Sequence, residues 1–521
     1  MTRELPEIVI QRIDSRGLGR GTFLLPDGSP RKVIVPGTLP GDVVDVVVRR
    51  RKAGALHGEV SRLISTDHPR VQPFCRHFSQ CGGCTLQDLA YPDQLLLKQL
   101  MVERAFAEVE GTLPAVATLA EGGGPAQGDA PAQEGDTPGA GNTPPAGTAP
   151  PTGTPLPAIL PILPAATTRR YRNKLEFSFG AQRWLQQAEV DNAAEIPDRR
   201  GLGFHVAGRF DRVLDLTECH LQPDPSEQIR EFLRRWSGEG GLTYYDAREH
   251  HGLLRLLIIR TTLGGQAMVT VMFGEDNPAA IEEVMQALAA EFPHLEELNY
   301  VVNTTRNDSI FGHEIRPYRG PGYITEHCGP VQLRLRPKAF FQTNPEQALN
   351  LYTRALELAD LPESPLVFDL YSGIGSIALF LAPRVGTVVG IESVADAVAA
   401  ARENAQLNGI ANALFEEGEV EKVLPEVVAR HGTPQALVVD PPRMGLHPAA
   451  RTAILALDPL PQRIVYISCN PRTQATDLLE LRRKYRVTAL QPVDMFPQTR
   501  HVENIAILEL KVDPPTADGV E

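Results

Sequence analysis

Four short apolar runs, rich in β-branched residues, dominate the hydrophobic pattern of the C-terminal third of the chain. They are Leu366–Leu370 and residues 388–391, 437–439 and 464–467. Stretches with helical periodicity separate the first three runs, and each of these three ends in a carboxylate or a glycine-rich turn. Apolar strands that alternate with helices are typical of a parallel sheet buried on both faces. The pattern therefore predicts an α/β domain.

Polar or small residues follow each run where its strand is expected to end. The carboxyl ends of parallel strands meet at one edge of the sheet, and ligands bind outside that edge. We therefore expect the active site there, formed by Asp369, Gly373, Gly375, Glu392, Asp440 and Cys469.

Residues 1–66 alternate strand-like runs with turns that contain Gly or Pro. Short strands at close spacing predict a small OB-type β-barrel, a fold that commonly binds single-stranded nucleic acid. The stretch IVPGTLPGDVVDVVV, residues 34–48, resembles the TRAM domain, an RNA-binding barrel found on RNA-modifying enzymes. The alternative is a barrel that only packs on its neighbour.

Charge is unevenly distributed along the chain. The net charge of −13 disfavours a nucleic-acid partner, but residues 1–70 hold 12 Lys or Arg against 8 Asp or Glu. Residues 49–52 form a continuous basic run, which either contacts RNA or is a solvated loop. No run approaches the roughly 18 apolar residues that span a bilayer, and the N-terminal residues lack the apolar core of a signal peptide. We expect a cytoplasmic protein.

Three cysteines, Cys75, Cys81 and Cys84, have the spacing C-x5-C-x2-C. In a cytoplasmic protein this density favours metal or cluster ligation over disulfides. We expect Cys219 to be the fourth ligand, and four thiolates suit zinc or an iron–sulfur cluster equally well. A group of unligated cysteines is the alternative.

Composition divides the rest of the chain. Residues 111–166 contain 12 Pro and 10 Gly but no aromatic residue, Lys or Arg, which predicts a disordered insertion. Residues 92–110 have a helical pattern, with Pro92 at its start and Gly111 just past its end. We assign residues 67–91 and 167–335 to a mixed α+β middle domain, residues 92–110 and 336–512 to the catalytic domain, and residues 513–521 to a tail.

The turn after the first apolar run, DLYSGIGS, indicates the cofactor. It lacks the third glycine of a dinucleotide-binding motif, and the carboxylate of Asp369 would repel a pyrophosphate. Glu392, at the end of the next run, is placed like the acid that binds ribose hydroxyls. Together these features favour S-adenosylmethionine, which carries an ammonium and a sulfonium, over NAD. The alternative is that either acid is a helix cap.

Two further motifs indicate the reaction. Asp440-Pro441-Pro442 resembles the motif of amino-group methyltransferases, but Arg443 replaces the aromatic residue that stacks on their target base. Cys469 ends a strand on the same edge, and thiolates are strong nucleophiles, although such a cysteine is often only a small core residue.

A thiolate beside a methyl donor favours methylation at C5 of uracil, because addition of the thiolate to C6 makes C5 nucleophilic. A base must then remove the C5 proton. Glu503, just before the final apolar run, is our candidate for this base, and His501 is the competing one.

These motifs together identify the chain as similar to the RNA uracil-5-methyltransferase family. The resemblance rests on the TRAM-like barrel, C-x5-C-G-G-C, YRNK, FFQTN, DLYSGIG, DPPRMG, SCNP and HVEN. It implies a class I, Rossmann-like methyltransferase domain and a [4Fe–4S] cluster on Cys75, Cys81, Cys84 and Cys219. It also implies Cys469 as nucleophile, Glu503 as base, and contacts to S-adenosylmethionine from Gln342, Tyr371, Ser376, Glu392, Glu419 and Asp440. Ser376 and Glu419 stand where the family often has Asn.

Members of this family that have both a TRAM barrel and an iron–sulfur cluster look most like the 23S ribosomal RNA enzymes, and the transfer-RNA enzymes are the alternative. We expect a monomer. RNA cytosine-5 methylation normally uses two cysteines at the rim, and only Cys469 is present there. A non-catalytic RNA-binding cluster protein is the remaining alternative, which the presence of Asp440, Cys469 and Glu503 disfavours.

Overall fold

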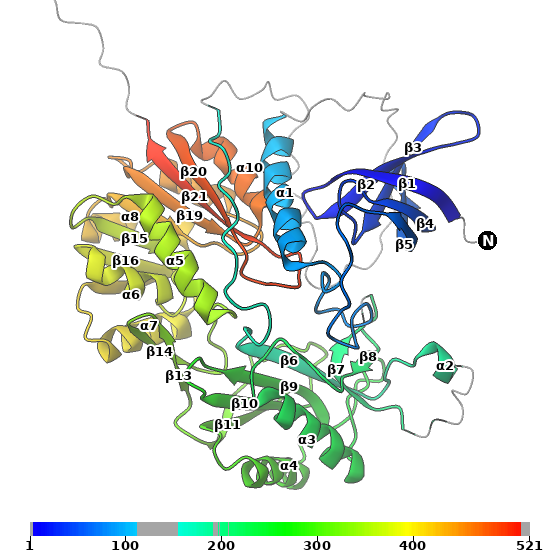
Figure 1. The fold of residues 1–521 in the computed structure, drawn as a ribbon. Coiled ribbons are helices and arrows are strands. Elements are labelled where there is room, and N and C mark those ends of the chain that lie inside the picture. The colour runs from blue at the N-terminus through cyan, green and yellow to red at the C-terminus, as the bar shows by residue number, and fades with distance from the viewer. Residues whose placement is uncertain (1–3, 112–154, 191–195, 197, 207, 512–521) are drawn as a thin grey trace, which may run out of the picture.

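The computed structural model describes residues 4–111, 155–190, 196, 198–206 and 208–511. Three main sheets, each with its own apolar core, make up the molecule (Figure 1). Among the described residues, no helix is both long and apolar enough to span a membrane. The predicted tail and residues 112–154 of the predicted insertion lie outside the described residues.

The N-terminal sheet is a closed five-stranded barrel, as the alternating pattern predicted. Alternate side chains of each strand point inwards, so aliphatic residues such as Leu5, Ile10 and Val44 fill its centre. The basic run 49–52 is the exposed end of a strand rather than a loop. In barrel order the strands are β1 (Glu4–Ile13), β2 (Leu18–Leu24), β3 (Pro30–Pro36), β5 (Ala55–Ser65) and β4 (Val43–Lys52).

The middle domain is a seven-stranded mixed sheet covered by two helices, in agreement with the predicted α+β class. The central strands β9 (Leu254–Thr261) and β10 (Ala267–Phe273) are buried along their whole length and mostly apolar, although β9 also carries the buried Arg255 and Arg260. The strand order is β12 (Arg316–Arg319), β11 (Glu297–Val302), β10 (Ala267–Phe273), β9 (Leu254–Thr261), β6 (Lys174–Gly180), β7 (Gly201–His205) and β8 (Val213–Asp215). The helices of this domain are α2 (Gln187–Val190), α3 (Ser226–Glu239) and α4 (Pro278–Glu291).

The third sheet contains the four predicted strands, and all four run parallel. Its order is β17 (Ala413–Glu417), β16 (Thr387–Glu392), β15 (Leu366–Leu370), β18 (Ala436–Val439), β19 (Arg463–Ser468), β21 (Glu503–Leu510) and β20 (Tyr485–Val493). Strand β21 is antiparallel to both of its neighbours. The order and the helices on both faces agree with the predicted Rossmann-like domain.

Apolar clusters lie on both faces of this sheet, which explains why its strands lack alternation. The predicted helix at 92–110 is α1 (Tyr91–Glu110), which packs on one face through Val102 and Phe106. The other helices are α5 (Pro345–Ala359), α6 (Ser376–Leu381), α7 (Ala395–Leu407), α8 (Val420–His431), α9 (Pro448–Leu455) and α10 (Pro471–Leu481).

The hairpin of β13 (Ile324–Cys328) and β14 (Val331–Leu335) corrects our domain boundary at residue 335. We assigned it to the middle domain, but its inward side chains belong to the core that α5, α6 and α7 form on the third sheet. The side chains of Asn404 on α7 and of Asn408, the residue after α7, also accept hydrogen bonds from backbone N–H groups of β14. The hairpin is therefore part of the catalytic domain.

Residues 155–166 correct the predicted disordered insertion. This segment runs beside β20: the Leu160 N–H donates to Leu490 O, and the Leu163 N–H donates to Pro492 O, each at 2.9 Å. Its apolar side chains pack on both cores of the catalytic domain. β20 is an edge strand with unpaired backbone groups, and the sequence LPAILPIL supplies the apolar surface that the average composition concealed.

Candidate active site and cysteine pocket

The two proposed catalytic residues are neighbours across antiparallel strands. Ser468, the last residue of β19, pairs with Asn504 of β21, so the next residue, Cys469, lies opposite Glu503. Asp440 follows β18, which pairs with β19 on its other side. The structure therefore brings together Cys469, Glu503 and Asp440 at the carboxyl edge of the sheet.

Burial raises the pKa of all three groups, and neighbouring charges add to the rise at Glu503 and Cys469. Glu503 is only 3% exposed, and burial, reinforced by Asp440, raises the pKa of its carboxyl to about 8. Burial also raises the pKa of Asp440 to about 7, although this residue keeps some solvent contact. Burial and the nearby Glu503 and Asp440 raise the pKa of the Cys469 thiol to about 12. Arg443 opposes the rise at Cys469 and Glu503, which makes it the cation that favours their ionised forms.

The loop that carries Arg443 is held by Asp477, a residue that no motif indicated. Asp477 is completely buried on α10, and its Oδ2 accepts hydrogen bonds from the Leu446 N–H at 2.8 Å and the Tyr466 hydroxyl at 2.6 Å. Its Oδ1 pairs with the Arg451 guanidinium at 2.7 Å. One buried acid thus fastens the loop after β18 to β19 and α9.

The segment leading into β21 is held by a second buried network that sequence reasoning missed. The Lys98 ammonium on α1 donates to Asp494 Oδ1 at 2.5 Å and to Phe496 O at 2.9 Å, and the Lys98 and Asp494 side chains are both inaccessible to solvent. The Tyr91 hydroxyl donates to Asp494 Oδ2 at 2.9 Å. A lone Lys in an amphipathic helix gives no sequence signal that its partner lies some 400 positions away.

A pair of amides connects this segment to the cysteine-rich loop. The Gln94 amide donates to Gln498 Oε1 at 3.0 Å, and Gln498 returns a backbone N–H to Gln94 Oε1 at 2.9 Å. The Gln498 carbonyl accepts the N–H groups of Thr85 and Leu86, which directly follow Cys84. The segment before Glu503 is therefore held both by α1 and by the loop after Cys84.

His501, the competing base, lies two residues before Glu503 with part of its ring exposed. Partial burial, and to a smaller extent Arg443 and other cations, lowers the pKa of His501 to about 4. The ring is therefore neutral near pH 7. Glu503, in contrast, is the charged group with the largest effect on the pKa of the Cys469 thiol.

The carboxylate of Glu392, at the end of β16, accepts hydrogen bonds from the backbone of the glycine-rich turn and of the residues after β16. The N–H of Gly373 donates to Glu392 Oε2 at 3.0 Å, and the N–H of Val394 donates to Oε1 at 2.8 Å. Gly375 has a φ of +82°, and a Cβ there would lie 2.8 Å from the Phe415 ring, so this position requires glycine. Below the turn, Asp369 is completely buried, and neither of its oxygens has a hydrogen-bond partner among the described residues. Burial raises the pKa of Asp369 well above its usual range.

A cavity of about 520 Å³, partly open to solvent, lies outside the ends of β16 and β17. Two of the predicted cofactor residues, Tyr371 and Glu419, line it together with Ile391, Val420, Pro442 and Leu446. The lining of this cavity includes neither Cys469 nor Glu503.

The remaining predicted cofactor residues lie beside this edge rather than in the cavity lining. Gln342 is buried, and its carbonyl accepts a hydrogen bond from the Asn173 amide at 3.3 Å. Ser376 begins α6, with its hydroxyl 3.5 Å from that of Tyr352. Asp440 stands at the other side of the turn, next to the catalytic pair.

The four predicted cluster ligands line one pocket of the middle domain. Cys75, Cys81, Cys84 and Cys219 are all free thiols there, among Phe78, Leu216 and Leu221. Burial raises the pKa of Cys84 to about 12 and that of Cys219 to about 11. The sequence placed these four cysteines together, and the structure agrees.

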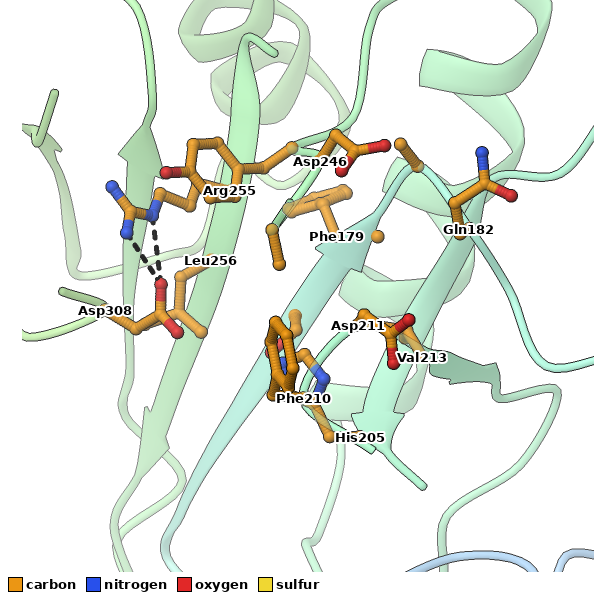
Figure 2. Close-up of a pocket in the computed structure, with 15 residues that line it drawn as sticks. Phe179, Gln182, His205, Phe210, Asp211, Val213, Asp246, Arg255, Leu256 and Asp308 are labelled. Carbon is orange, nitrogen blue, oxygen red and sulfur yellow. Dashed lines mark hydrogen bonds and ion pairs between the residues drawn. The ribbon is translucent and has the colours of Figure 1, made fainter. Parts of the chain in front are cut away.

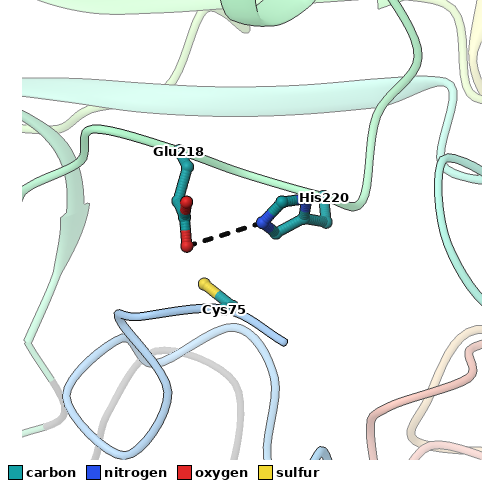
Figure 3. Close-up of side chains that lie close together, drawn as sticks. All are labelled: Cys75, Glu218 and His220. Carbon is teal, nitrogen blue, oxygen red and sulfur yellow. Dashed lines mark ion pairs between the residues drawn. The ribbon is translucent and has the colours of Figure 1, made fainter. Parts of the chain in front are cut away.

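A second donor group overlaps this pocket. The ligand atoms of Cys75, Glu218 and His220 all lie within 4.8 Å of one another, with the acid and the imidazole 3.5 Å apart (Figure 3). In Figure 3, Cys75 approaches from one loop, while Glu218 and His220 flank Cys219 on another. This group offers a mixed ligand set beside the four-thiol set.

The chain is similar to known proteins along most of its length. Residues 325–511 match the family model described as tRNA (Uracil-5-)-methyltransferase. A protein of Bacteroides thetaiotaomicron described as an uncharacterized RNA methyltransferase is 38% identical over 486 residues, which cover 92% of this chain and 97% of that protein. One of Porphyromonas gingivalis with the same description is 39% identical over 484 residues, covering 91% and 95%.

A solved structure matches as extensively. The crystal structure of Pyrococcus abyssi tRNA (uracil-54, C5)-methyltransferase in complex with S-adenosyl-L-homocysteine superimposes with a TM-score of 0.65 and 25% sequence identity. The match covers 96% of this chain and 99% of that one, so it includes the barrel, the middle domain and the catalytic domain.

Proposed function

Because this chain belongs to the RNA uracil-5-methyltransferase family, we propose that it transfers a methyl group from S-adenosylmethionine to C5 of a uridine in 23S ribosomal RNA. The observation that carries the proposal is the position of Cys469 opposite Glu503 at the carboxyl edge of the sheet. A nucleophile and a base are both needed for methylation at C5 of uracil, and this pair supplies one of each.

The residues at the rim suit S-adenosylmethionine, which supplies an electrophilic methyl group on a sulfonium. The cavity beside Tyr371 and Glu419 offers apolar walls for an adenine. Each carboxylate oxygen of Glu392 has a further lone pair, which can accept a hydrogen bond from a ribose hydroxyl. The unpaired carboxyl of Asp369 is a buried acid that a cationic ligand would stabilise in its charged form. Gln342, Ser376 and Asp440 complete the proposed contacts from the same edge.

Cys469 would begin the reaction by adding its thiolate to C6 of the uracil. The C5–C6 double bond becomes an enolate whose C5 attacks the methyl group. Glu503 would then take the proton from C5, the double bond re-forms, and the thiolate of Cys469 leaves. Arg443 is the chain's own cation that favours the thiolate, whose pKa is otherwise raised by burial.

The four thiols of the middle domain fit an iron–sulfur cluster, because they line one pocket and have no other covalent partner. Cys75, Cys81, Cys84 and Cys219 would hold a [4Fe–4S] cluster, which would tie the loop of residues 75–84 to the loop after β8. The preference for iron over zinc comes from the family resemblance.

RNA is proposed to contact the barrel at the exposed basic run 49–52. The target uridine must leave its stack to meet Cys469, at a cost of a few kcal/mol that a single-stranded target lowers. We further propose that the protein is a cytoplasmic monomer.

Transfer RNA is the second candidate substrate. The solved structure that superimposes on nearly the whole chain is a tRNA uracil-54 enzyme, which favours this alternative. The 23S proposal rests on the combination of a barrel with four clustered cysteines.

Tritiated methyl transfer to unmodified 23S ribosomal RNA and to unmodified transfer RNA, followed by nucleoside analysis, tests the proposal. We expect label in 5-methyluridine of the ribosomal RNA. Label in transfer RNA alone would select the second candidate, and label in 5-methylcytidine or in a base-amino group would contradict the reaction itself.

A further inference from the structure

A second pocket lies in the middle domain, separate from the candidate active site and from the cysteine pocket. Strands β6, β7 and β9 and the turn before β8 surround it, and Phe179, Gln182, His205, Phe210 and Tyr245 are among its lining residues (Figure 2). Phe179 and Tyr245 are buried and give it an aromatic wall. Nothing in the proposed reaction uses this pocket.

Phe210 is the unusual residue of the pocket. It stands in the turn between β7 and β8 with 69% of its surface exposed, beside His205 in Figure 2. A phenyl ring left in water at the mouth of an aromatic pocket gains by stacking on a flat ligand. Nδ1 of His205 is buried without a hydrogen-bond partner among the described residues.

Arginines and aspartates alternate at the mouth of the pocket. Asp211, Asp246, Asp308 and Arg255 line it, and Arg255 pairs with Asp308. Asp211 is nearly inaccessible and is shared by Arg209 at 3.0 Å, Arg212 at 3.3 Å and Arg248 at 2.5 Å. Three guanidinium groups face this single carboxylate, and the side chains of Arg209 and Arg248 are 45% and 59% exposed. Exposed guanidinium groups beside an aromatic ring complement the phosphate and base of a nucleotide, and they disfavour an uncharged apolar ligand.

The turn is fastened to the cysteine-rich loop. Val206, the residue after β7, forms an antiparallel bridge with Cys81. The same loop continues through Thr85 and Leu86 to Gln498, in the segment before Glu503. The pocket is therefore connected to the catalytic pair by ordered backbone.

We propose that the mouth of this pocket binds one unstacked nucleotide of the substrate RNA, outside the target uridine, with its base on the exposed ring of Phe210 and its phosphate beside Arg209 and Arg248. The interior of the pocket, about 30 Å³, is too small to admit a base. The proposal rests on the proposed function for the identity of the ligand as RNA. It assigns part of the RNA recognition to the β7–β8 turn of the middle domain.

The test is filter binding of full-length protein to radiolabelled, unmodified 23S ribosomal RNA and transfer RNA transcripts, measured separately. We expect Phe210→Ala to weaken about tenfold the binding of whichever unmodified RNA the protein methylates, because one base stack is lost. Phe210→Trp should restore this binding. Arg248→Ala should weaken binding and reduce the salt dependence by about one counterion.

Two matched variants serve as controls. Leu263→Ala removes an equally exposed apolar side chain, 60% accessible, at the far end of β9. Arg235→Ala removes an equally exposed guanidinium on α3. Both should bind RNA like the wild type.

Unchanged RNA affinity in Phe210→Ala, or an equal loss in Leu263→Ala, would overturn the proposal. The result is distinguishable from failure of the proposed function, because binding is measured without methyl transfer. Methylation of uridine with no effect of Phe210 contradicts only this pocket, whereas Phe210-dependent binding without uridine methylation contradicts only the reaction.

Discussion

Cys469 and the four cysteines of the middle domain share one property and differ in another. Burial raises the pKa of the thiol in both regions, so acidity does not separate a nucleophile from a ligand. The neighbours do. Cys469 faces the carboxyls of Glu503 and Asp440 and the guanidinium of Arg443, whereas Cys84 faces the other three thiols. Acid, base and cation around a thiol suit a reaction; thiols around a thiol suit an ion or cluster.

Removal of the base from the rim should have the largest effect. Glu503→Gln keeps the size of the side chain but cannot take the C5 proton, so the enzyme should stop bonded to C6 of its methylated product. Turnover should fall by about 10²-fold or more, and a protein–RNA species carrying the methyl label should survive denaturing electrophoresis. His501→Ala is the matched control and should turn over. If His501→Ala traps the adduct and Glu503→Gln does not, the base is His501.

The raised pKa of Glu503 predicts a pH dependence for the same step. Its carboxyl is protonated below about pH 8 and becomes a base above it, so adduct release should quicken about tenfold per pH unit between pH 6 and 7.5 and level off above 8. Single-turnover release of the adduct isolates this step from ionisation of Cys469. A release rate that is flat across this range would show that Glu503 is ionised throughout and that its burial is relieved in the complex.

In the cysteine pocket, the expected effect is on iron. Anaerobically purified protein should hold about four irons per chain, as a cuboidal cluster on four thiolates requires. Cys219→Ser should lose much of this iron, while Cys328→Ala, which removes a thiol buried in the catalytic core, should keep it. Retention of iron by Cys219→Ser with loss in His220→Ala would instead favour the group of Cys75, Glu218 and His220.

The corrected insertion predicts the smallest effect, on stability. Deletion of residues 112–154 should leave the melting temperature unchanged. Replacement of Leu156, Ile159, Ile162 and Leu163 by Ser should destabilise the protein by about 2–5 kcal/mol, because these partly buried side chains cover the catalytic core. Thermal unfolding of both variants decides between an insertion that is dispensable throughout and one whose last part is a structural element.

The sequence was most informative where one local pattern decides the structure. The strands at 366–370 and 464–467 are apolar on both faces, so their ends and the residues after them were predictable. The position of Cys219 beside the other three cysteines was predictable, because a three-thiol group was expected to need a fourth ligand. Lys98 and Asp477 were not, since each is an ordinary charged residue in a helical pattern until its partner in a distant segment is known. Residues 155–166 were concealed because an average over 56 residues hid a short apolar stretch that pairs with an edge strand at Leu160 and Leu163.

The most direct test of the central claim is to identify the residue that bonds to the uracil. RNA with 5-fluorouridine at the target should trap wild-type protein after methyl transfer, since fluorine at C5 cannot leave as a cation. Mass spectrometry of the digested adduct is predicted to find the methylated fluorouridine on the peptide that contains Cys469, and Cys469→Ala should give neither adduct nor methylated RNA. An adduct on another residue, or continued methylation by Cys469→Ala, would contradict the account.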